Sequence, residues 1–182
     1  MSILMLLFAL INPPQLEIDL SVHLETKGVE KVNKTQFVRY VIEPTLKKIG
    51  LYNESATNLL VMIAAHESMK GHYIVQTTGQ AKGLFQMEDA THDYLLAWLK
   101  KNKPELYVKV VALADNEPTA MKMVTDLDYA TAMARVFFLR FPEALPNGSD
   151  VDAMAAYAKR RWNTSLGKAT PSDYKQAYLS WK

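Results

Sequence analysis

A single glutamate stands at the end of the most apolar helical stretch in the chain. Residues 59–67 read LLVMIAAHE, so apolar side chains cover most faces of the predicted helix before Glu67, and such a helix is buried. Burial disfavours a charged carboxylate and raises its pKa. A glutamic acid that stays partly protonated near neutral pH can donate a proton to a leaving group. The simpler interpretation is an ion pair with Lys70 or Lys82.

Two further blocks of residues accompany this glutamate. The first is a glycine-bearing loop before a predicted helix start, and its Gln86 follows Glu67 by 19 residues. The second block lies on a late predicted helix. Their residues are Gly83-Leu84-Phe85-Gln86 with Ala90-Thr91, and Ala156-Tyr157-Ala158 followed by Asn163-Thr164. The glycine-bearing segment is expected to turn back toward the end of the Glu67 helix.

Together these blocks resemble the soluble lytic transglycosylases and the goose-type lysozyme-like superfamily. In that family Glu-Ser ends a buried helix, Gly-Leu-Met-Gln follows, and Ala-Tyr-Asn-Ala-Gly lies on a late helix. Glu67-Ser68 and residues 83–86 fit this pattern, with Phe85 where Met is usual. Glu88-Asp89 replace an apolar-Pro pair, and the late block lacks the Asn and the Gly. The resemblance covers about residues 37–178, and its Asn-Thr ending is similar to phage-encoded relatives.

The resemblance implies a mainly α, lysozyme-like domain with a small β-hairpin next to the catalytic helix. It also implies cleavage of the β-1,4 bond between N-acetylmuramic acid and N-acetylglucosamine in bacterial peptidoglycan. Glu67 would act as the single catalytic acid of a phage-type lytic transglycosylase, which leaves 1,6-anhydro-muramic ends. The implied place of action is the bacterial periplasm or cell wall, with a virion-associated location as an alternative. The route of export and the oligomeric state stay open.

The same resemblance supplies the other site residues. Tyr157 would be catalytic, with a hydrogen bond near Glu67 or to the N-acetyl group of the substrate. The implied partner is the glycan strand, with no cofactor, no metal and no nucleic acid. The substrate-binding candidates are Ser68, Gly83, Phe85, Gln86, Met87, Thr91 and Asn163. Aromatic faces suit pyranose rings, so Tyr73, Tyr94, Trp98 and Trp162 are further candidates for the sugar groove, with core packing as the alternative for Trp98.

The positions of the acidic residues bear on the choice between transglycosylase and hydrolase. A two-carboxylate glycosidase needs a second acid about 5–9.5 Å from the first. No Asp or Glu lies between Glu67 and Glu88, and we expect Glu88, Asp89 and Asp93 to serve as helix N-terminal charges. This favours single-acid chemistry. The alternatives are a hydrolytic muramidase, as an endolysin or virion lysozyme, and a non-catalytic peptidoglycan-binding or virion structural protein.

Composition excludes several other classes of protein. A chain of 182 residues predicts one domain, and a formal net charge of +2 is too small to indicate nucleic acid. The absence of cysteine excludes a cysteine nucleophile, disulfides and thiolate metal sites. His66-Glu67 resembles half of a zinc-binding His-Glu-x-x-His motif, but Lys70 stands where the second histidine would be.

Periodicity divides the chain into an N-terminal arm, residues 1–34, and a helical domain, residues 35–182. Apolar residues 1–11 are too short to span a bilayer and are the only candidate membrane contact. Alternation over residues 16–24 predicts a strand, and another alternation within residues 69–82 predicts the hairpin. Thr35 is the predicted N-cap of the first helix, which Pro44 should kink. Asn53 or Ser55 is expected to cap the helix that ends at Glu67, and Ser149 the helix over residues 150–162. Pro118 and Pro171 are each expected to open a helix. Lys159-Arg160-Arg161 is expected to be a solvated helix face, or alternatively a patch that steers an anionic substrate.

Overall fold

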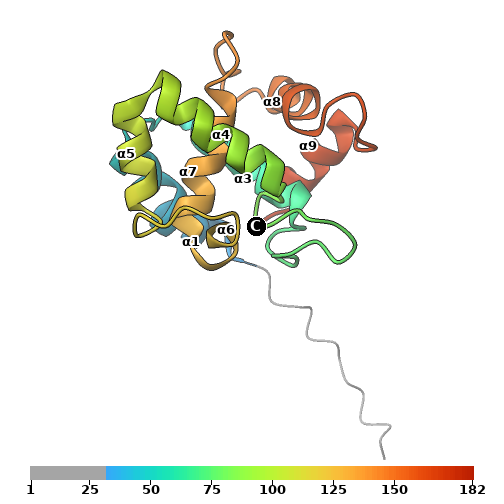
Figure 1. Cartoon of the computed structure of the whole chain (residues 1–182). Coiled ribbons are helices and arrows are strands. Elements are labelled where there is room, and N and C mark those ends of the chain that lie inside the picture. Colours follow the sequence, from blue (N-terminus) through green and yellow to red (C-terminus); the bar gives the residue numbers. More distant parts are fainter. Residues whose placement is uncertain (1–31) are drawn as a thin grey trace, which may run out of the picture.

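The described part of the chain is built almost entirely from helices. A computed structural model describes residues 32–182, and it contains no β-strand in that range (Figure 1). The expectation of a mainly α domain is thus confirmed. The helices are α1 (Lys34–Phe37), η1 (Val38–Ile42), α2 (Glu43–Ile49), α3 (Glu54–Glu67), α4 (Asp89–Asn102), α5 (Pro104–Ala112), α6 (Lys122–Thr125), α7 (Leu127–Phe138), α8 (Val151–Ala158), η2 (Lys159–Asn163) and α9 (Pro171–Leu179), where η marks a π-helical turn.

The first helical run shows how proline acts within a helix. Pro44 has no N–H to donate to the preceding turn, and its ring crowds the carbonyl four residues back. The turn before Pro44 is the wide π-helical turn η1, so the predicted irregularity is present. The predicted N-cap was wrong: the cap is Asn33, two residues before Thr35, and its side chain accepts the Gln36 N–H at 3.0 Å.

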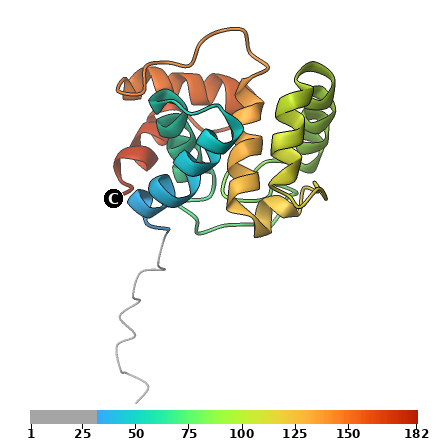
Figure 2. The same cartoon turned by 90° about the vertical axis from the view of Figure 1, so that its left-hand side faces the viewer.

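Helix α3 forms the centre of the hydrophobic core. It packs against α7, α8 and α9, and residues 56–57 and 59–65 are all buried (Figures 1 and 2). Of the two predicted caps, Asn53 and Ser55, the structure has Asn53, whose side chain accepts the Ala56 N–H at 2.7 Å. Each buried Leu, Ile, Val or Met side chain contributes about 1.5–3 kcal/mol. The position of α3 is therefore strongly fixed, and so is the residue at its end.

Two predicted helix starts differ from those observed. Residues from Pro118 were expected to be helical, but α6 begins only at Lys122. The cap of α8 is Asp150, whose side chain accepts the Ala153 N–H at 2.9 Å, where Ser149 was expected. The start of α9 is as predicted, with Pro171 in its first turn and a capping box between Thr170 and Asp173.

The segment between α3 and α4 contains no regular hairpin. Its ladder is reduced to isolated antiparallel bridges, which pair Val75 with Lys82 and Lys82 with Met87. Residues 76–80, which separate the arms, are exposed and polar, so no apolar cross-strand pairs support a longer ladder. The chain still reverses direction here, and Lys82 connects the two bridges.

The predictions for the N-terminal part of the chain fall mostly outside the described residues. These are the arm, its apolar residues 1–11 and the strand over residues 16–24. Among the helices of residues 32–182, none has the length and apolar character needed to cross a membrane.

Candidate functional site

The chain leaves α3 immediately after Glu67 through a tightly bonded turn. The buried Ser68 hydroxyl donates to the Ala64 carbonyl at 2.8 Å and accepts the Gly71 N–H at 3.0 Å. Met69 and Gly71 both adopt positive φ angles, 51° and 84°. Ser68 was predicted to bind substrate, but it lines neither of the cavities beside Glu67. Its bonds hold the end of the helix and so fix the direction of Glu67.

A second tight loop, residues 82–87, faces the end of α3. Lys82 and Met87 exchange two backbone hydrogen bonds of 2.9 and 3.0 Å, which close the loop. Gly83 has a φ of 72°, and a Cβ atom there would lie 2.4 Å from the Met123 carbonyl oxygen. Phe85 is buried against Phe37, with ring centroids 6.4 Å apart. Gly83 and Phe85 were predicted to bind substrate; in the structure they fix the conformation of the loop and line neither cavity beside Glu67.

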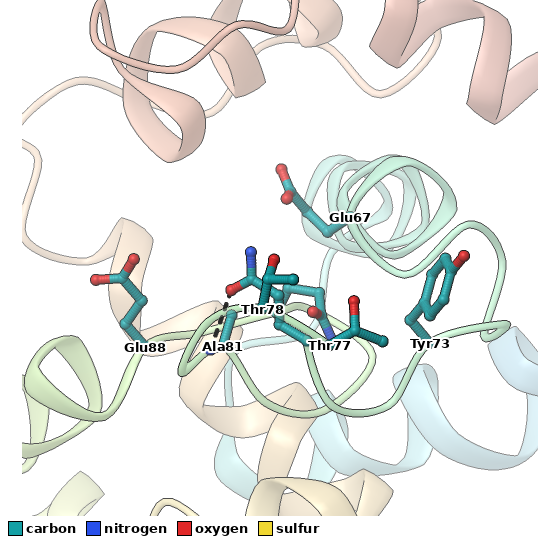
Figure 3. Close-up of a pocket in the computed structure, with 8 residues that line it drawn as sticks. Glu67, Tyr73, Thr77, Thr78, Ala81 and Glu88 are labelled. Atoms are coloured by element: carbon teal, nitrogen blue, oxygen red, sulfur yellow. Dashed lines mark hydrogen bonds between the residues drawn. The ribbon is translucent and has the colours of Figure 1, made fainter.

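Gln86 and Glu88 line solvent-accessible cavities beside Glu67. One cavity of about 360 Å³ lies toward the loop of residues 73–81, and a second of about 410 Å³ lies toward η2. Glu67, Gln86 and Glu88 line both cavities, so the Glu67 carboxylate stands where they meet. The first is lined also by Tyr73, Gln76, Thr77, Thr78 and Ala81 (Figure 3). The second is lined also by Met87, Thr91, Phe137, Trp162, Asn163, Thr164 and Leu166.

The outcome for the predicted substrate-binding residues is mixed. Gln86, Met87, Thr91 and Asn163 line the cavities, whereas Ser68, Gly83 and Phe85 do not. Of the four aromatic candidates, only Tyr73 and Trp162 are lining residues, one in each cavity. Phe137 was not predicted, and its ring packs on Trp162 at a centroid distance of 4.6 Å. An aromatic wall and several amide and hydroxyl groups thus border the acid.

The Glu67 carboxyl has the electrostatic character expected of an acid at neutral pH. Burial raises its pKa from 4.5 to about 7, and a hydrogen bond from the Tyr174 hydroxyl to Oε1 opposes the rise. The alternative of an ion pair with Lys82 is not realised, since Lys82 Nζ lies 2.5 Å from Asp89 Oδ1. Lys70 Nζ donates to Ser180 Oγ at 2.7 Å. Desolvation thus dominates, as the buried helix predicted.

This pKa shift makes folding stability depend on pH. Between pH 4.5 and 7 the folded protein binds the Glu67 proton more tightly than the unfolded chain, so stability falls as pH rises. We expect the unfolding free energy of the wild type, relative to Glu67→Gln, to drop by about 3 kcal/mol from about pH 4.5 to pH 8. Urea unfolding of both proteins at the two pH values measures this change. A difference that does not vary with pH would contradict the raised pKa.

The tyrosine beside Glu67 is Tyr174 of α9, and not the predicted Tyr157. Tyr157 is buried, its ring packs on Phe138 with centroids 5.7 Å apart, and its hydroxyl has no hydrogen-bond partner among the described residues. Tyr157 lines neither cavity beside Glu67. Tyr174 is also fully buried, and its ring lies 4.1 Å from that of His66. The capping box at Thr170 predicts the start of α9, but nothing local indicates that α9 packs on α3.

A chain of polar contacts extends from Glu67 through Tyr174 to Asn163, which lines the second cavity. Burial is the main cause that raises the pKa of Tyr174, Glu67 adds to the rise, and a hydrogen bond with the Asn163 side chain opposes it. Asn163 Oδ1 in turn accepts from Lys159 Nζ at 2.7 Å. Because its pKa is raised, the Tyr174 hydroxyl stays protonated and remains a donor to Glu67. Tyr174 therefore holds one Glu67 oxygen and leaves the other available.

Removing the Tyr174 hydroxyl should shift the titration of Glu67 upward. The hydrogen bond favours the charged carboxylate, and such bonds are worth about 1.5–3 kcal/mol. We expect Tyr174→Phe to raise the Glu67 pKa, and with it the alkaline limb of any Glu67-dependent activity, by about one pH unit. A pH–rate profile measures this shift. Tyr178→Phe is the matched control on the same helix, and an unchanged alkaline limb in Tyr174→Phe would contradict the role of Tyr174.

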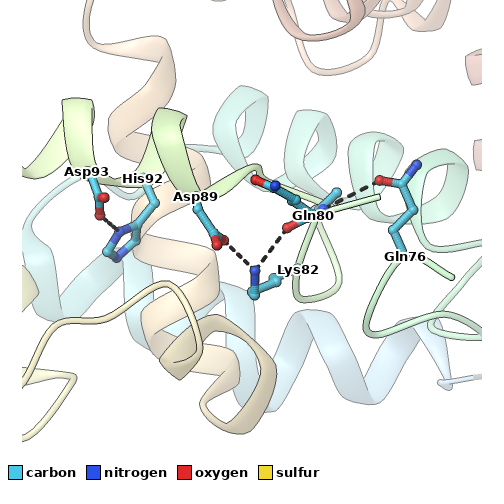
Figure 4. Close-up of polar contacts among 7 residues, drawn as sticks. Gln76, Gln80, Lys82, Asp89, His92 and Asp93 are labelled. Atoms are coloured by element: carbon cyan, nitrogen blue, oxygen red, sulfur yellow. Dashed lines mark hydrogen bonds and ion pairs between the residues drawn. The ribbon is translucent and has the colours of Figure 1, made fainter. Parts of the chain in front are cut away.

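Polar contacts connect the loop of residues 82–87 to α4, and of the acidic residues at the start of α4 it is Glu88 that lines the cavities. Lys82 Nζ bonds the Gln80 carbonyl at 3.1 Å as well as Asp89, and His92 Nδ1 lies 2.8 Å from Asp93 (Figure 4). Asp89 and Asp93 are thus engaged at the start of α4. Glu88 occupies the N-cap position but makes no side-chain capping bond. Glu88 is exposed and lines the cavities, in addition to its predicted place at the helix N-terminus.

No metal site accompanies these groups in the described residues. Within residues 32–182, His, Asp and Glu side chains form no cluster of three or more that could hold a metal ion. His66 instead stacks on Tyr174, and burial lowers the pKa of His66. The groups that line the site include the Glu67 carboxyl, side-chain amides and aromatic rings. Comparison of the chain with protein-family models, with curated proteins and with solved structures finds no match.

Proposed function

We propose that the chain cleaves glycan strands of bacterial peptidoglycan, with Glu67 as the catalytic acid of a lysozyme-like domain. The observation that carries this proposal is the place of Glu67 at the meeting point of two cavities, with a pKa of about 7. An extended polymer lying through both cavities would present one of its bonds to this carboxyl. The sequence resemblance at residues 67–68 and 83–86 indicates which polymer.

The chemistry requires Glu67 to hold a proton and then to take one back. The protonated carboxyl donates to the glycosidic oxygen, the bond to the muramic C1 breaks, and an oxocarbenium-like state develops. The Glu67 carboxylate then takes the proton of the muramic 6-hydroxyl, whose oxygen bonds to C1. One sugar chain leaves with a new hydroxyl, and the other ends in a 1,6-anhydro ring. No water is consumed, and Glu67 ends protonated as it began.

The cavity walls suit an acetylated sugar chain. Amide and hydroxyl groups of Gln76, Thr78 and Gln86 can bond sugar hydroxyls and acetamido groups. Tyr73 and Trp162 present aromatic surface on the two sides of Glu67, which suits the apolar faces of pyranose rings. This mixture of polar groups and rings favours a carbohydrate over a wholly apolar ligand.

Glu88 supports a second candidate function, a hydrolytic muramidase with the same acid. It lines both cavities together with Glu67 and carries no capping bond. Figure 3 shows both residues in the first cavity. In a hydrolase, a second carboxylate activates water or forms a covalent intermediate. Glu88 is the carboxylate that lines both cavities together with Glu67. The sequence had led us to expect it as a helix N-terminal charge.

Product analysis separates these functions. Mass spectrometry of digested peptidoglycan should find 1,6-anhydro-muramic ends, and Glu88→Gln should keep its rate within about tenfold of the wild type, since a lost catalytic base costs about 10²–10⁴-fold. Reducing ends together with a large loss in Glu88→Gln would assign the hydrolase. Binding to the wall without any product would leave only the non-catalytic class.

A further inference from the structure

A third cavity lies apart from the two cavities beside Glu67, at the opposite end of α3. Its volume is about 440 Å³, and it shares no lining residue with the two cavities beside Glu67. It is lined by the first turn of α3, the end of α7 and the loop that follows α7. The residues used below are Asn53, Ser55, Lys103, Arg135, Phe138 and Glu143.

Arg135 makes this cavity unusual. The residue is only 8 % exposed, yet its Nε atom is buried with no hydrogen-bond partner, and no ion pair to it is found among residues 32–182. A buried charge is costly unless it is paired and hydrogen-bonded. Burial accordingly lowers the pKa of Arg135. Arg135 thus lines the cavity with a guanidinium whose Nε has no partner in the described residues, and an anion in the cavity could pair with it.

The surroundings of Arg135 carry an excess of positive charge. Burial is the main cause that raises the pKa of Tyr157; Glu143 adds to the rise, whereas Arg161, Arg135 and Arg160 oppose it. Glu143 itself is paired with Arg161 at 2.5 Å. The buried Tyr157 hydroxyl, which also has no partner among the described residues, lies within this group. Lys103 adds a further cation at the cavity wall.

Helix α3 adds a favourable field for an anion. Its first turn, represented by Ser55, lines the cavity, and the helix has 14 residues. The N-terminus of such a helix carries a partial positive charge. Here the Asn53 side chain accepts the Ala56 N–H and the exposed Glu54 lies in the first turn, so the helix is a smaller contribution than Arg135. The helix terminus and the unpaired guanidinium are independent observations, and both favour a negative ligand in the same cavity.

We propose that this cavity binds a carboxylate carried on an apolar group, such as the C-terminal residue of a short peptide. The guanidinium fork matches the two oxygens of a carboxylate. Phe138 and Leu139 supply apolar wall for the group that bears it. One buried guanidinium balances one negative charge, and the Glu143 carboxylate on the wall disfavours a dianion such as phosphate. The proposal concerns binding, and it does not depend on glycan cleavage at Glu67.

Calorimetric titration of the full chain with N-acetyl-alanyl-alanine and with its C-terminal amide tests the proposal. The wild type should bind the acid at least about tenfold more tightly than the amide, because only the acid carries the charge that can pair with Arg135. Arg135→Met should abolish this preference without loss of thermal stability, since replacing an unpaired buried charge by an apolar side chain is neutral or stabilising. Lys48→Met, an exposed lysine in α2, and Glu67→Gln should both bind as the wild type does.

Several results would overturn the proposal. Equal binding of acid and amide, retained binding in Arg135→Met, or binding of inorganic phosphate in place of the peptide acid would each do so. A large loss of stability in Arg135→Met together with an unchanged preference in Arg135→Lys would show that Arg135 serves the fold alone. Arg135→Lys keeps the charge but lacks the fork, so we expect it to reduce the preference for the acid about tenfold.

Discussion

Glu67→Gln is expected to lower the rate of peptidoglycan cleavage by about 10²–10⁴-fold, the range that general acid–base catalysis contributes. The amide keeps the size of the side chain and can still accept the hydrogen bond from Tyr174. It cannot donate a proton of suitable acidity to the glycosidic oxygen. Release of soluble fragments from purified cell walls measures the rate.

A matched control separates this loss from a general change in charge. Glu54→Gln makes the same substitution in the first turn of the same helix, where the side chain is exposed and distant from the cavities beside Glu67. We expect Glu54→Gln to cleave walls at the rate of the wild type. A folded Glu67→Gln protein that keeps near-normal turnover would remove Glu67 from the mechanism.

Gly83→Ala should destabilise the fold by about 3 kcal/mol or more and change the conformation of the loop that carries Gln86. A φ of 72° costs an alanine about 1–2 kcal/mol. The new Cβ would also lie 2.4 Å from the Met123 carbonyl oxygen, a backbone atom that cannot turn away, and forced overpacking costs about 1–3 kcal/mol. Urea unfolding of the variant and the wild type gives the difference.

Gly79→Ala is the control within the same segment. Gly79 has no positive φ, and an added Cβ would meet only the Gln76 side chain, which can move. Its cost should stay below about 1 kcal/mol. Similar losses in the two variants would mean that the backbone of Gly83 is not the constraint on the loop.

The position of Glu67 could be predicted from the sequence because it depends on a local pattern of apolar residues. Apolar residues on nearly every face of α3 require burial, and burial of the helix fixes both the place and the pKa of its last residue. The same reasoning located the loop opposite, since Gly83 and Gln86 follow within one short segment. Local pattern and tertiary packing agree at these positions.

Sequence reasoning failed where the decisive contacts are long-range. Tyr174 lies 107 residues from Glu67, and no pattern in α9 states which helix it covers. Tyr157 was chosen from a motif, yet it packs on Phe138. The predicted hairpin is present only as isolated bridges, and the residues that connect its arms, 76–80, are polar and exposed. Ser68, Gly83 and Phe85 belong to the motif as residues that hold the backbone, which a motif alone does not distinguish from residues that touch a ligand.

The most direct test of the account is the titration of Glu67 by carboxyl ¹³C NMR. The wild-type protein labelled at glutamate side chains should show one resonance, absent from Glu67→Gln, that titrates near pH 7. A Glu67 resonance that titrates near 4.5 would mean that this carboxyl is charged at neutral pH, and the assignment of a proton-donating acid at the meeting point of the two cavities would be wrong.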